Sequence, residues 1–149
     1  MTPPPAPVPT SSCHIEHRLP TPAEHRTIAE AVGWGHAFAW ETMPQSLANS
    51  RLGAIAIVEG TVVGMGRVVG DGVAYWYIQD VAVLPAHQGA GIGQALVAAL
   101  IDQIAARTPA PAFVGLFATV EGMPLYERLG FTPGDMQGMV RIVAPSTPE

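Results

Sequence analysis

The sequence predicts a mixed α/β domain in which helices flank a sheet, and three observations indicate this class. Hydrophobic residues make up 48% of the 149 residues and charged residues 13%, so material for a buried core is available. Short β-branched segments alternate with helical segments along the chain. Turn signals at Glu59-Gly60 and Asp71-Gly72 predict hairpins, so the sheet is not purely parallel.

The two ends of the chain differ from its middle in composition. Residues 1–12 are rich in proline, and we expect a disordered, extended tail. Residues 13–144 are expected to form a single domain. Residues 145–149 include Pro145 and Pro148 and are expected to form a C-terminal tail that frays.

A capping box marks the start of the first helix. Thr21 can cap it, Pro22 suits the first helical position, and Glu24 completes the box. The helix is expected to end at Gly33. A short second helix is predicted at residues 44–49.

Strands dominate the middle of the chain. β-branched residues on either side of Glu59-Gly60 predict a hairpin with strands at 53–59 and 61–69. A long aromatic and β-branched strand is predicted at 74–83, ending before Pro85. An edge strand is expected near His14 and His17.

The clearest helix covers residues 91–107, because four apolar residues recur on one face at helical spacing, namely Ile92, Leu96, Leu100 and Ile104. Three shorter elements complete the chain: a buried strand, a helix and a final strand, at residues 112–118, 124–129 and 136–143.

Charge and cysteine content exclude several classes of function. All seven basic residues are arginines, so a lysine-dependent phosphate loop or Schiff base is ruled out. A formal charge of −5 without a basic run argues against nucleic acid or an anionic membrane as partner. One cysteine, Cys13, excludes an internal disulfide framework and a cysteine zinc cluster. His14 and His17 are interpreted as solvated, so no metal is expected.

A cytoplasmic location is expected, since no apolar run approaches the ~18 residues of a membrane span and no secretory signal is apparent.

A glycine-rich turn leads from the long strand into the best helix. Gly89, Gly91 and Gly93 allow unusual backbone angles and close approach of a ligand. The free N–H groups and the positive dipole end of the helix favour a phosphate or pyrophosphate there. An alternative interpretation is that these glycines form only a tight turn. The G-x-G-x-G spacing differs from the dinucleotide fingerprint G-x-G-x-x-G.

Three motifs resemble those of one family. Residues 88–93, with the sequence QGAGIG, match the Q/R-x-x-G-x-G/A signature of the GNAT superfamily of acyl-CoA-dependent N-acetyltransferases. Residues 77–85 are similar to that superfamily's splayed fourth strand, and residues 125–131 to its LY-x-x-x-GF element. The resemblance covers residues 19–143. It implies a central mixed, mostly antiparallel sheet with splayed fourth and fifth strands and flanking helices.

The resemblance also implies a binding site for acetyl-CoA as co-substrate. The backbone of the fourth strand would bind the pantetheine arm as an added strand would, at Val81, Ala82 and Val83. The turn would hold the pyrophosphate, at Gln88, Gly89, Ala90, Gly91, Ile92, Gly93 and Gln94. Arg128 stands where the family often has a basic residue near the CoA. Val120 replaces an asparagine that the family often carries, so any CoA contact of that asparagine is absent or replaced.

Two residues are candidates for proton transfer. Tyr126 is the candidate donor to the leaving thiolate, with packing beside Leu125 and Phe131 as the alternative. Asp80, the only carboxylate on its strand, is a candidate base or amine anchor. The alternatives are a structural aspartate, or deprotonation through water without a dedicated base.

Acceptor binding is expected at aromatic and polar residues outside the turn. Trp34, Trp40 and Glu41 lie in the family's variable acceptor segment, where an aromatic wall with one carboxylate suits a cationic amine. Core packing is the alternative. Without a bulge, Tyr77 and Gln79 would share the cleft face with Val81. A bulge would redirect Asp80.

The function predicted from these observations is transfer of an acetyl group from acetyl-CoA to a primary amine of a small molecule by direct attack. Two alternatives stay open: an acyl-CoA sensor without turnover, and a protein or peptide N-acetyltransferase. A homodimer is compatible with the sequence.

Overall fold

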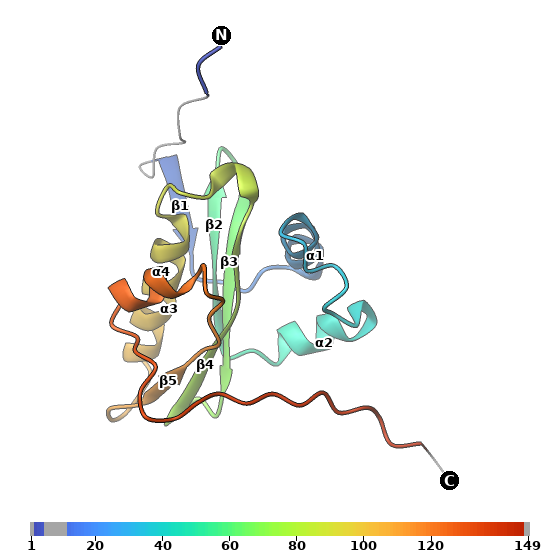
Figure 1. Ribbon diagram of the computed structural model, residues 1–149, viewed down its shortest axis with the longest axis vertical. Coiled ribbons are helices and arrows are strands. Elements are labelled where there is room, and N and C mark those ends of the chain that lie inside the picture. The colour runs from blue at the N-terminus through green and yellow to red at the C-terminus, as the bar shows by residue number, and fades with distance from the viewer. Residues whose placement is uncertain (1, 5–11, 148–149) are drawn as a thin grey trace. The chain divides into compact units, whose positions relative to one another are not determined.

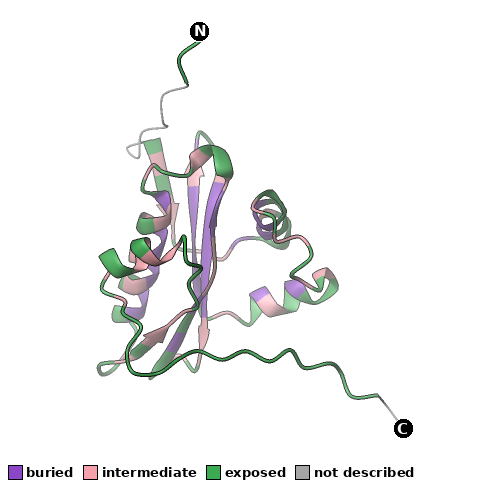
Figure 2. Ribbon diagram, in the orientation of Figure 1, coloured by how far each residue is buried: buried purple, intermediate pink, exposed green. Residues whose placement is uncertain are grey.

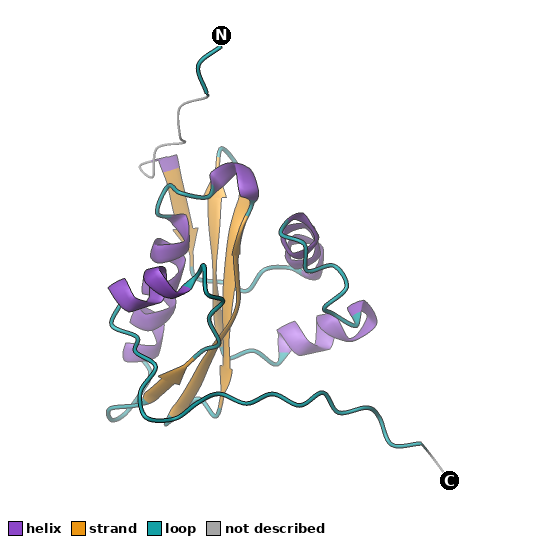
Figure 3. Ribbon diagram, viewed as in Figure 1, coloured by secondary structure: helices purple, strands orange, loops and turns teal. Residues whose placement is uncertain are grey.

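The computed structural model describes residues 2–4 and 12–147, so most of the predicted proline-rich tail, residues 1 and 5–11, lies outside the described residues. Five strands form one sheet in the order β1-β2-β3-β4-β5 (Figure 3). The first four pair antiparallel and β5 pairs parallel to β4, which confirms the mixed, mostly antiparallel sheet. Their bounds are Cys13–Glu16, Leu52–Val58, Thr61–Gly70, Tyr75–Val83 and Phe113–Gly115.

Helices cover both faces of this sheet (Figure 1). α1, Pro22–Ala31, and α2, Met43–Ala48, lie on one face, and a 3-10 helix, η2, Trp40–Thr42, precedes α2. α3, Ile92–Ala105, lies on the other face and follows a second 3-10 helix, η3, Pro85–His87. The sides of the strands and of α3 that face each other are buried (Figure 2).

The capping box predicted for α1 is confirmed. The Thr21 hydroxyl accepts a hydrogen bond from the Glu24 N–H at 3.1 Å, and the Glu24 carboxylate accepts one from the Thr21 N–H at 2.8 Å. This cap fixes the start of the helix and therefore the face on which His25, Ile28 and Ala29 are buried.

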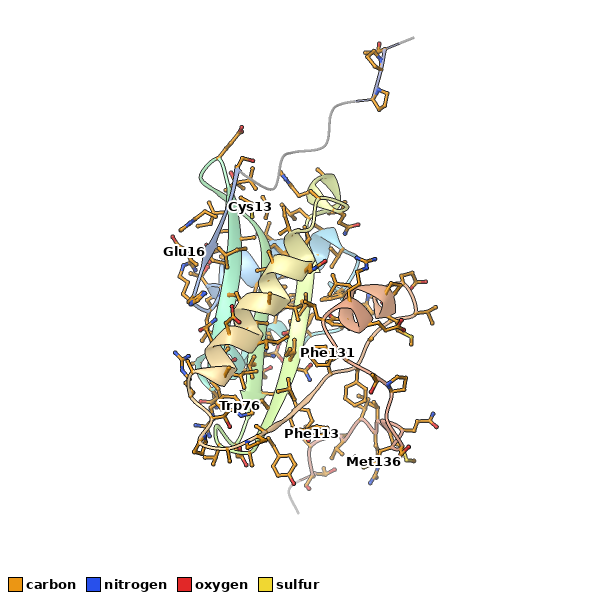
Figure 4. All side chains as sticks on the ribbon, turned by 90° about the vertical axis from the view of Figure 1, so that its left-hand side faces the viewer. Cys13, Glu16, Trp76, Phe113, Phe131 and Met136 are labelled. Carbon is orange, nitrogen blue, oxygen red and sulfur yellow. The ribbon has the colours of Figure 1, made fainter. Side chains whose placement is uncertain are left out.

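Two glycines of β3 let α3 lie close to the sheet. A Cβ on Gly64 would stand 2.9 Å from Leu96 Cδ1, and one on Gly66 would stand 3.0 Å from Leu100 Cδ1. The side of β3 that carries these glycines therefore faces α3. Trp76, which is 1% exposed, lies on this α3 face of the sheet (Figure 4). Cys13 and Glu16 mark the two ends of edge strand β1.

The structure falls into two compact units, Met1–Leu116 and Phe117–Glu149. The first contains the sheet and α1 to α3. The second contains α4, Met123–Arg128, which confirms the helix predicted there. The prediction of one domain over residues 13–144 stays a prediction.

The strand predicted at residues 136–143 is wrong. None of these residues is in a strand, and Met136, Met139 and Ile142 are 78–90% exposed. The prediction rested on β-branched and apolar content, but a strand also needs a neighbouring strand to satisfy its N–H and C=O groups. None of the described strands pairs with this segment, which runs as a loop to residue 147 (Figure 3).

In the part of the chain that the structure describes, no helix is long and apolar enough to cross a membrane. The cytoplasmic location stays a prediction.

Candidate active site

One edge of β4 has no strand beside it over more than half of its length. The parallel pairing with β5 comprises Tyr75 with Phe113, Trp76 with Val114, and Tyr77 with Gly115, and it ends there. β5 is accordingly shorter than the predicted strand at 112–118. From Ile78 to Val83, no described strand pairs with this edge of β4, and an extended ligand can add to such an edge as a further strand would.

A bulge interrupts β4 within this open stretch. Arg67 of β3 pairs with Gln79, and Met65 pairs with Ala82, so the single residue Gly66 faces both Asp80 and Val81. Asp80 has a φ of 56°, in the left-handed region that non-glycine residues rarely adopt. Because of this extra residue, the alternation of side chains between the two faces of the sheet shifts by one residue after Asp80.

The shared face of Tyr77, Gln79 and Val81 was expected only without a bulge, and the bulge is present. Gln79 lies opposite Arg67, whose side chain reaches α2, so Tyr77 and Gln79 face the α1 and α2 side. Val81 instead faces α3, because its Cγ2 would be 3.3 Å from a Cβ on Gly66. Ala82 packs with Ile28 and Ala29 of α1. Tyr77 and Gln79 thus do not share a face with Val81.

The bulge turns the Asp80 carboxylate toward two buried partners. Its Oδ2 accepts hydrogen bonds from Arg67 Nε at 2.8 Å and from His25 Nε2 at 3.0 Å. Arg67 also donates through Nη1 to the Ser46 carbonyl and hydroxyl and to the Ser50 hydroxyl. One carboxylate therefore connects α1, β3 and, through Arg67, α2.

The electrostatics of this cluster keep Asp80 ionised. Burial, the largest single influence, raises the pKa of Asp80, but the His25 hydrogen bond and the Arg67 charge and hydrogen bond together outweigh it. The net result is a pKa below the usual value of aspartate. A carboxylate with a lowered pKa is a weak proton acceptor, so the structure favours an anchoring or positioning role over a base.

Aromatic rings surround His25. The centroids of the Phe38 and Trp40 rings lie 5.0 Å and 5.9 Å from that of its imidazole. The His25 side chain is 1% exposed, and its Nδ1 has no hydrogen-bond partner among the described residues. A buried polar atom without a partner is uncommon in a native fold, so this nitrogen calls for an explanation.

The predicted acceptor residues fall into two groups. Trp34 and Trp40 pack against the buried cluster that contains Ile28 and Met65, as the core-packing alternative had it. One face of the Trp40 ring already carries the Arg26 guanidinium, with Cζ 4.8 Å from the ring centroid. Trp40 therefore has an internal cation partner.

Two of the remaining acceptor candidates are more accessible, whereas Gln79 is partly buried like Trp34 and Trp40. Glu41 is exposed in η2, and Tyr77 is 36% exposed on β4. The Tyr77 ring centroid lies 5.9 Å from that of Phe113, which in turn lies 6.0 Å from that of Tyr75. Tyr77 thus belongs to an exposed aromatic group at the start of β4 and β5, apart from the rings around His25.

The predicted glycine turn is confirmed. It connects β4 to α3 and contains residues in the left-handed backbone conformation. Gly89 and Gly91 both have a φ of 81°, and Gly91 is the N-cap of α3. The Gln88 side chain donates to the Val83 carbonyl at 2.9 Å and so ties the turn to the end of β4. A Cβ on Gly89 would meet nothing within 4 Å, so its backbone angle rather than crowding requires glycine.

The first turn of α3 is open to an anion. No described side chain caps it, and the first backbone bond within the helix is from the Ala95 N–H to the Gly91 carbonyl. The earlier N–H groups, from Ile92 to Gln94, therefore have no partner inside the helix. They lie at the positive end of a 14-residue helix, which favours a phosphate.

In the second unit, Tyr126 lies on α4 and its ring packs edge-on against Phe131, with centroids 6.0 Å apart. Burial raises the pKa of the Tyr126 phenol, so it keeps its proton at neutral pH. Arg128 is exposed in the last turn of α4.

Comparison with known proteins identifies the family. Residues 50–133 match the model of the acetyltransferase (GNAT) domain. The chain belongs to the GNAT acetyltransferase family. The match includes β4, the glycine turn and α4, which are the three places where the sequence resembled that superfamily.

Solved structures agree with this assignment. A probable acetyltransferase from meticillin-resistant Staphylococcus aureus shares 25% identity over 88% of this chain and 99% of its own, with a TM-score of 0.79. A GNAT-family acetyltransferase from Streptococcus pneumoniae shares 27% identity over 89% of this chain and 99% of its own, with a TM-score of 0.75.

A third structure is alike in fold. It is an aminoglycoside acetyltransferase from an uncultured soil metagenomic sample, with 22% identity over 91% of this chain and 99% of its own, and a TM-score of 0.63.

His25 and Arg67, the two hydrogen-bond partners of the Asp80 carboxylate, were not predicted from the sequence. Both carried a signal: His25 stands on the apolar face of α1, and Arg67 interrupts an apolar strand. A polar residue in such a position needs a buried partner. The described residues contain no group of three or more His, Cys, Asp or Glu side chains placed to hold a metal ion.

Proposed function

We propose that this GNAT-family acetyltransferase transfers an acetyl group from acetyl-CoA to a primary amine of a small molecule, by direct attack of the amine on the thioester. The observation that carries the proposal is the continuity of the open edge of β4 with the uncapped start of α3. In coenzyme A, an extended pantetheine arm is joined to a diphosphate. The open edge of β4 and the start of α3, which would bind these two parts, follow one another along the chain.

The open edge suits the pantetheine arm. Val81 is the second residue of the bulge, and Ala82 and Val83 follow it, where no described strand pairs with β4 on the side away from β3. An arm with amide groups adds to such an edge as a further strand would. The turn with Gly89 and Gly91 then connects β4 to the first turn of α3. The N–H groups of Ile92, Gly93 and Gln94 in that turn suit the pyrophosphate.

The chemistry needs a neutral amine, a stabilised oxyanion and a protonated leaving group. A main-chain N–H near Val81 and Ala82 supports the oxyanion as charge develops on the thioester oxygen. The Tyr126 phenol, which retains its proton at neutral pH, supplies a proton to the departing thiolate. No acyl-enzyme is required, because the amine attacks the carbonyl directly.

Two measurements test the proposal. Calorimetry should show heat on titration with acetyl-CoA. Release of free CoA thiol should then depend on an added amine, in a panel of polyamines, arylalkylamines, aminoglycosides and peptides. Absence of any binding heat would contradict the proposal. Binding without turnover would indicate a sensor, and turnover with peptides alone would indicate a peptide acetyltransferase.

A further inference from the structure

The hydrogen bonds around Asp80 determine which nitrogen of His25 carries the proton. Asp80 is ionised and paired with Arg67, so its Oδ2 can only accept. His25 Nε2, 3.0 Å from that oxygen, must therefore be the donor. In the neutral imidazole, whose single N–H is then on Nε2, Nδ1 of His25 presents a bare lone pair.

That lone pair is buried and has no protein donor in the described part of the chain. Phe38 and Trp40, the rings that pack on His25, offer it no donor, since the Trp40 indole N–H donates to the Gly35 carbonyl at 2.9 Å. A buried acceptor is unfavourable without a donor. A role that only joins α1 to the sheet uses Nε2 of His25 and gives Nδ1 no function.

The hydrogen-bonded pair of His25 and Asp80 adjoins the residues that are proposed to stabilise the oxyanion. Asp80 directly precedes Val81 and Ala82, whose main-chain N–H groups are the proposed oxyanion donors, and the same bulge positions all three residues. A carboxylate behind an imidazole fixes its tautomer and stabilises the imidazolium that forms when the other nitrogen takes a proton. The charged groups near His25 are Asp80 of β4, Arg67 of β3 and, across the Trp40 ring, Arg26 of α1.

We propose that His25 accepts, at Nδ1 and through one intervening water molecule, the proton that the acceptor amine loses, with Asp80 and Arg67 as positioning residues. This inference rests on the proposed function. The acceptor enters as an ammonium ion and passes one proton to His25 through that water molecule. The neutral amine nitrogen then forms a bond to the thioester carbon, and the carbon–sulfur bond breaks. The thiolate takes a proton from Tyr126, which recovers one from the amide nitrogen, and His25 returns to its starting state by releasing its proton to solvent.

The test replaces His25 by glutamine. The amide of His25→Gln can donate to Asp80 from the place of Nε2, but it cannot accept a proton. We expect kcat/KM for the best amine to fall about 100-fold at pH 7, with acetyl-CoA affinity unchanged. The difference in kcat/KM between His25→Gln and the wild type should shrink as the pH approaches the amine pKa of ~10.4, because the amine is then already neutral. His14→Gln, on exposed edge strand β1, is the matched control and should retain full activity.

A structural role for His25 predicts a different pattern. The loss of activity would then follow the loss of thermal stability and would be equal at all pH values. Wild-type rates in a folded His25→Gln variant, or a loss independent of pH, would overturn the inference while leaving the proposed function intact. A wild-type protein that acetylates no amine would contradict both.

A second measurement does not depend on activity or on the variant. Nitrogen-15 NMR of the wild-type protein should show His25 as the neutral tautomer with the proton on Nε2. A proton on Nδ1 would remove the lone pair on which the inference depends.

Discussion

Arg67 Nε lies 2.8 Å from Asp80 Oδ2, at the bulge within the open part of β4. Both side chains are about nine-tenths buried. The hydrogen bonds of this carboxylate help to hold Asp80 in a left-handed backbone conformation.

The first prediction concerns this pair. Arg67→Met leaves the Asp80 carboxylate buried without its cation, and we expect the free energy of unfolding to fall by about 3–5 kcal/mol in urea titrations. Arg51→Met is the control, because Arg51 is exposed and donates only to the Gly70 carbonyl. Equal stability of the two variants would show that the Arg67–Asp80 pair is not stabilising.

The second prediction concerns the cap of α1. Hydrogen bonds from Arg18, opposed by burial and assisted by the Thr21 N–H, lower the pKa of Glu24 from 4.5 to about 2. A depressed pKa stabilises the fold above the unfolded value, and this stability is lost as the pH falls from about 4.5 toward 2. Glu24→Gln should therefore lower stability by about 1–2 kcal/mol at pH 7 and by much less near pH 2.

Thermal melts at both pH values provide the measurement. Glu30→Gln, which breaks an exposed pair with Arg26, should change stability by less than about 0.5 kcal/mol at either pH. A Glu24→Gln deficit that is the same at pH 7 and pH 2 would contradict the assigned pKa.

The third prediction separates backbone strain from ligand binding in the glycine turn. Gly89→Ala forces alanine into a φ of 81°, at a cost of about 1–2 kcal/mol, and puts a methyl group where the backbone would approach the diphosphate. Gly60→Ala has a matching φ of 79° and equally open surroundings in the β2–β3 turn.

Both variants should lose similar stability, and only Gly89→Ala should bind acetyl-CoA about tenfold more weakly in calorimetry. Equal affinities would remove the turn from the binding site.

The fourth prediction concerns Tyr126. Tyr126→Phe removes the phenolic proton while keeping the ring that packs on Phe131. We expect kcat to fall about 10- to 100-fold, with the Kd of acetyl-CoA within about twofold of the wild-type value. Tyr75→Phe, at the exposed start of β4, is the control and should leave kcat unchanged. Unchanged turnover in Tyr126→Phe would exclude the phenol as the proton donor.

Local signals made part of the fold and site predictable from the sequence. The capping box of α1 lies within four consecutive residues, and the glycine turn lies between a strand rich in aromatic and β-branched residues and a helix with a clear apolar period. Such features depend on neighbours in the chain. They were therefore visible without knowledge of the tertiary structure.

Long-range features were not predictable in the same way. His25 and Asp80 are 55 residues apart, and they meet only because α1 packs on the bulge of β4. The bulge itself depends on the register between β3 and β4, which alternation within one strand does not reveal. The strand predicted at residues 136–143 failed for a related reason, since its composition suits a strand but no partner strand is in place.

The unpaired edge of β4 also has a consequence for how the protein is handled. Exposed strand edges are templates for pairing with other chains, and from Ile78 to Val83 this edge meets no strand in the described structure. The bulge at Asp80 twists the ladder and makes that edge a poorer template. Preparations kept saturated with a coenzyme that occupies this edge should therefore aggregate more slowly on storage than ligand-free ones.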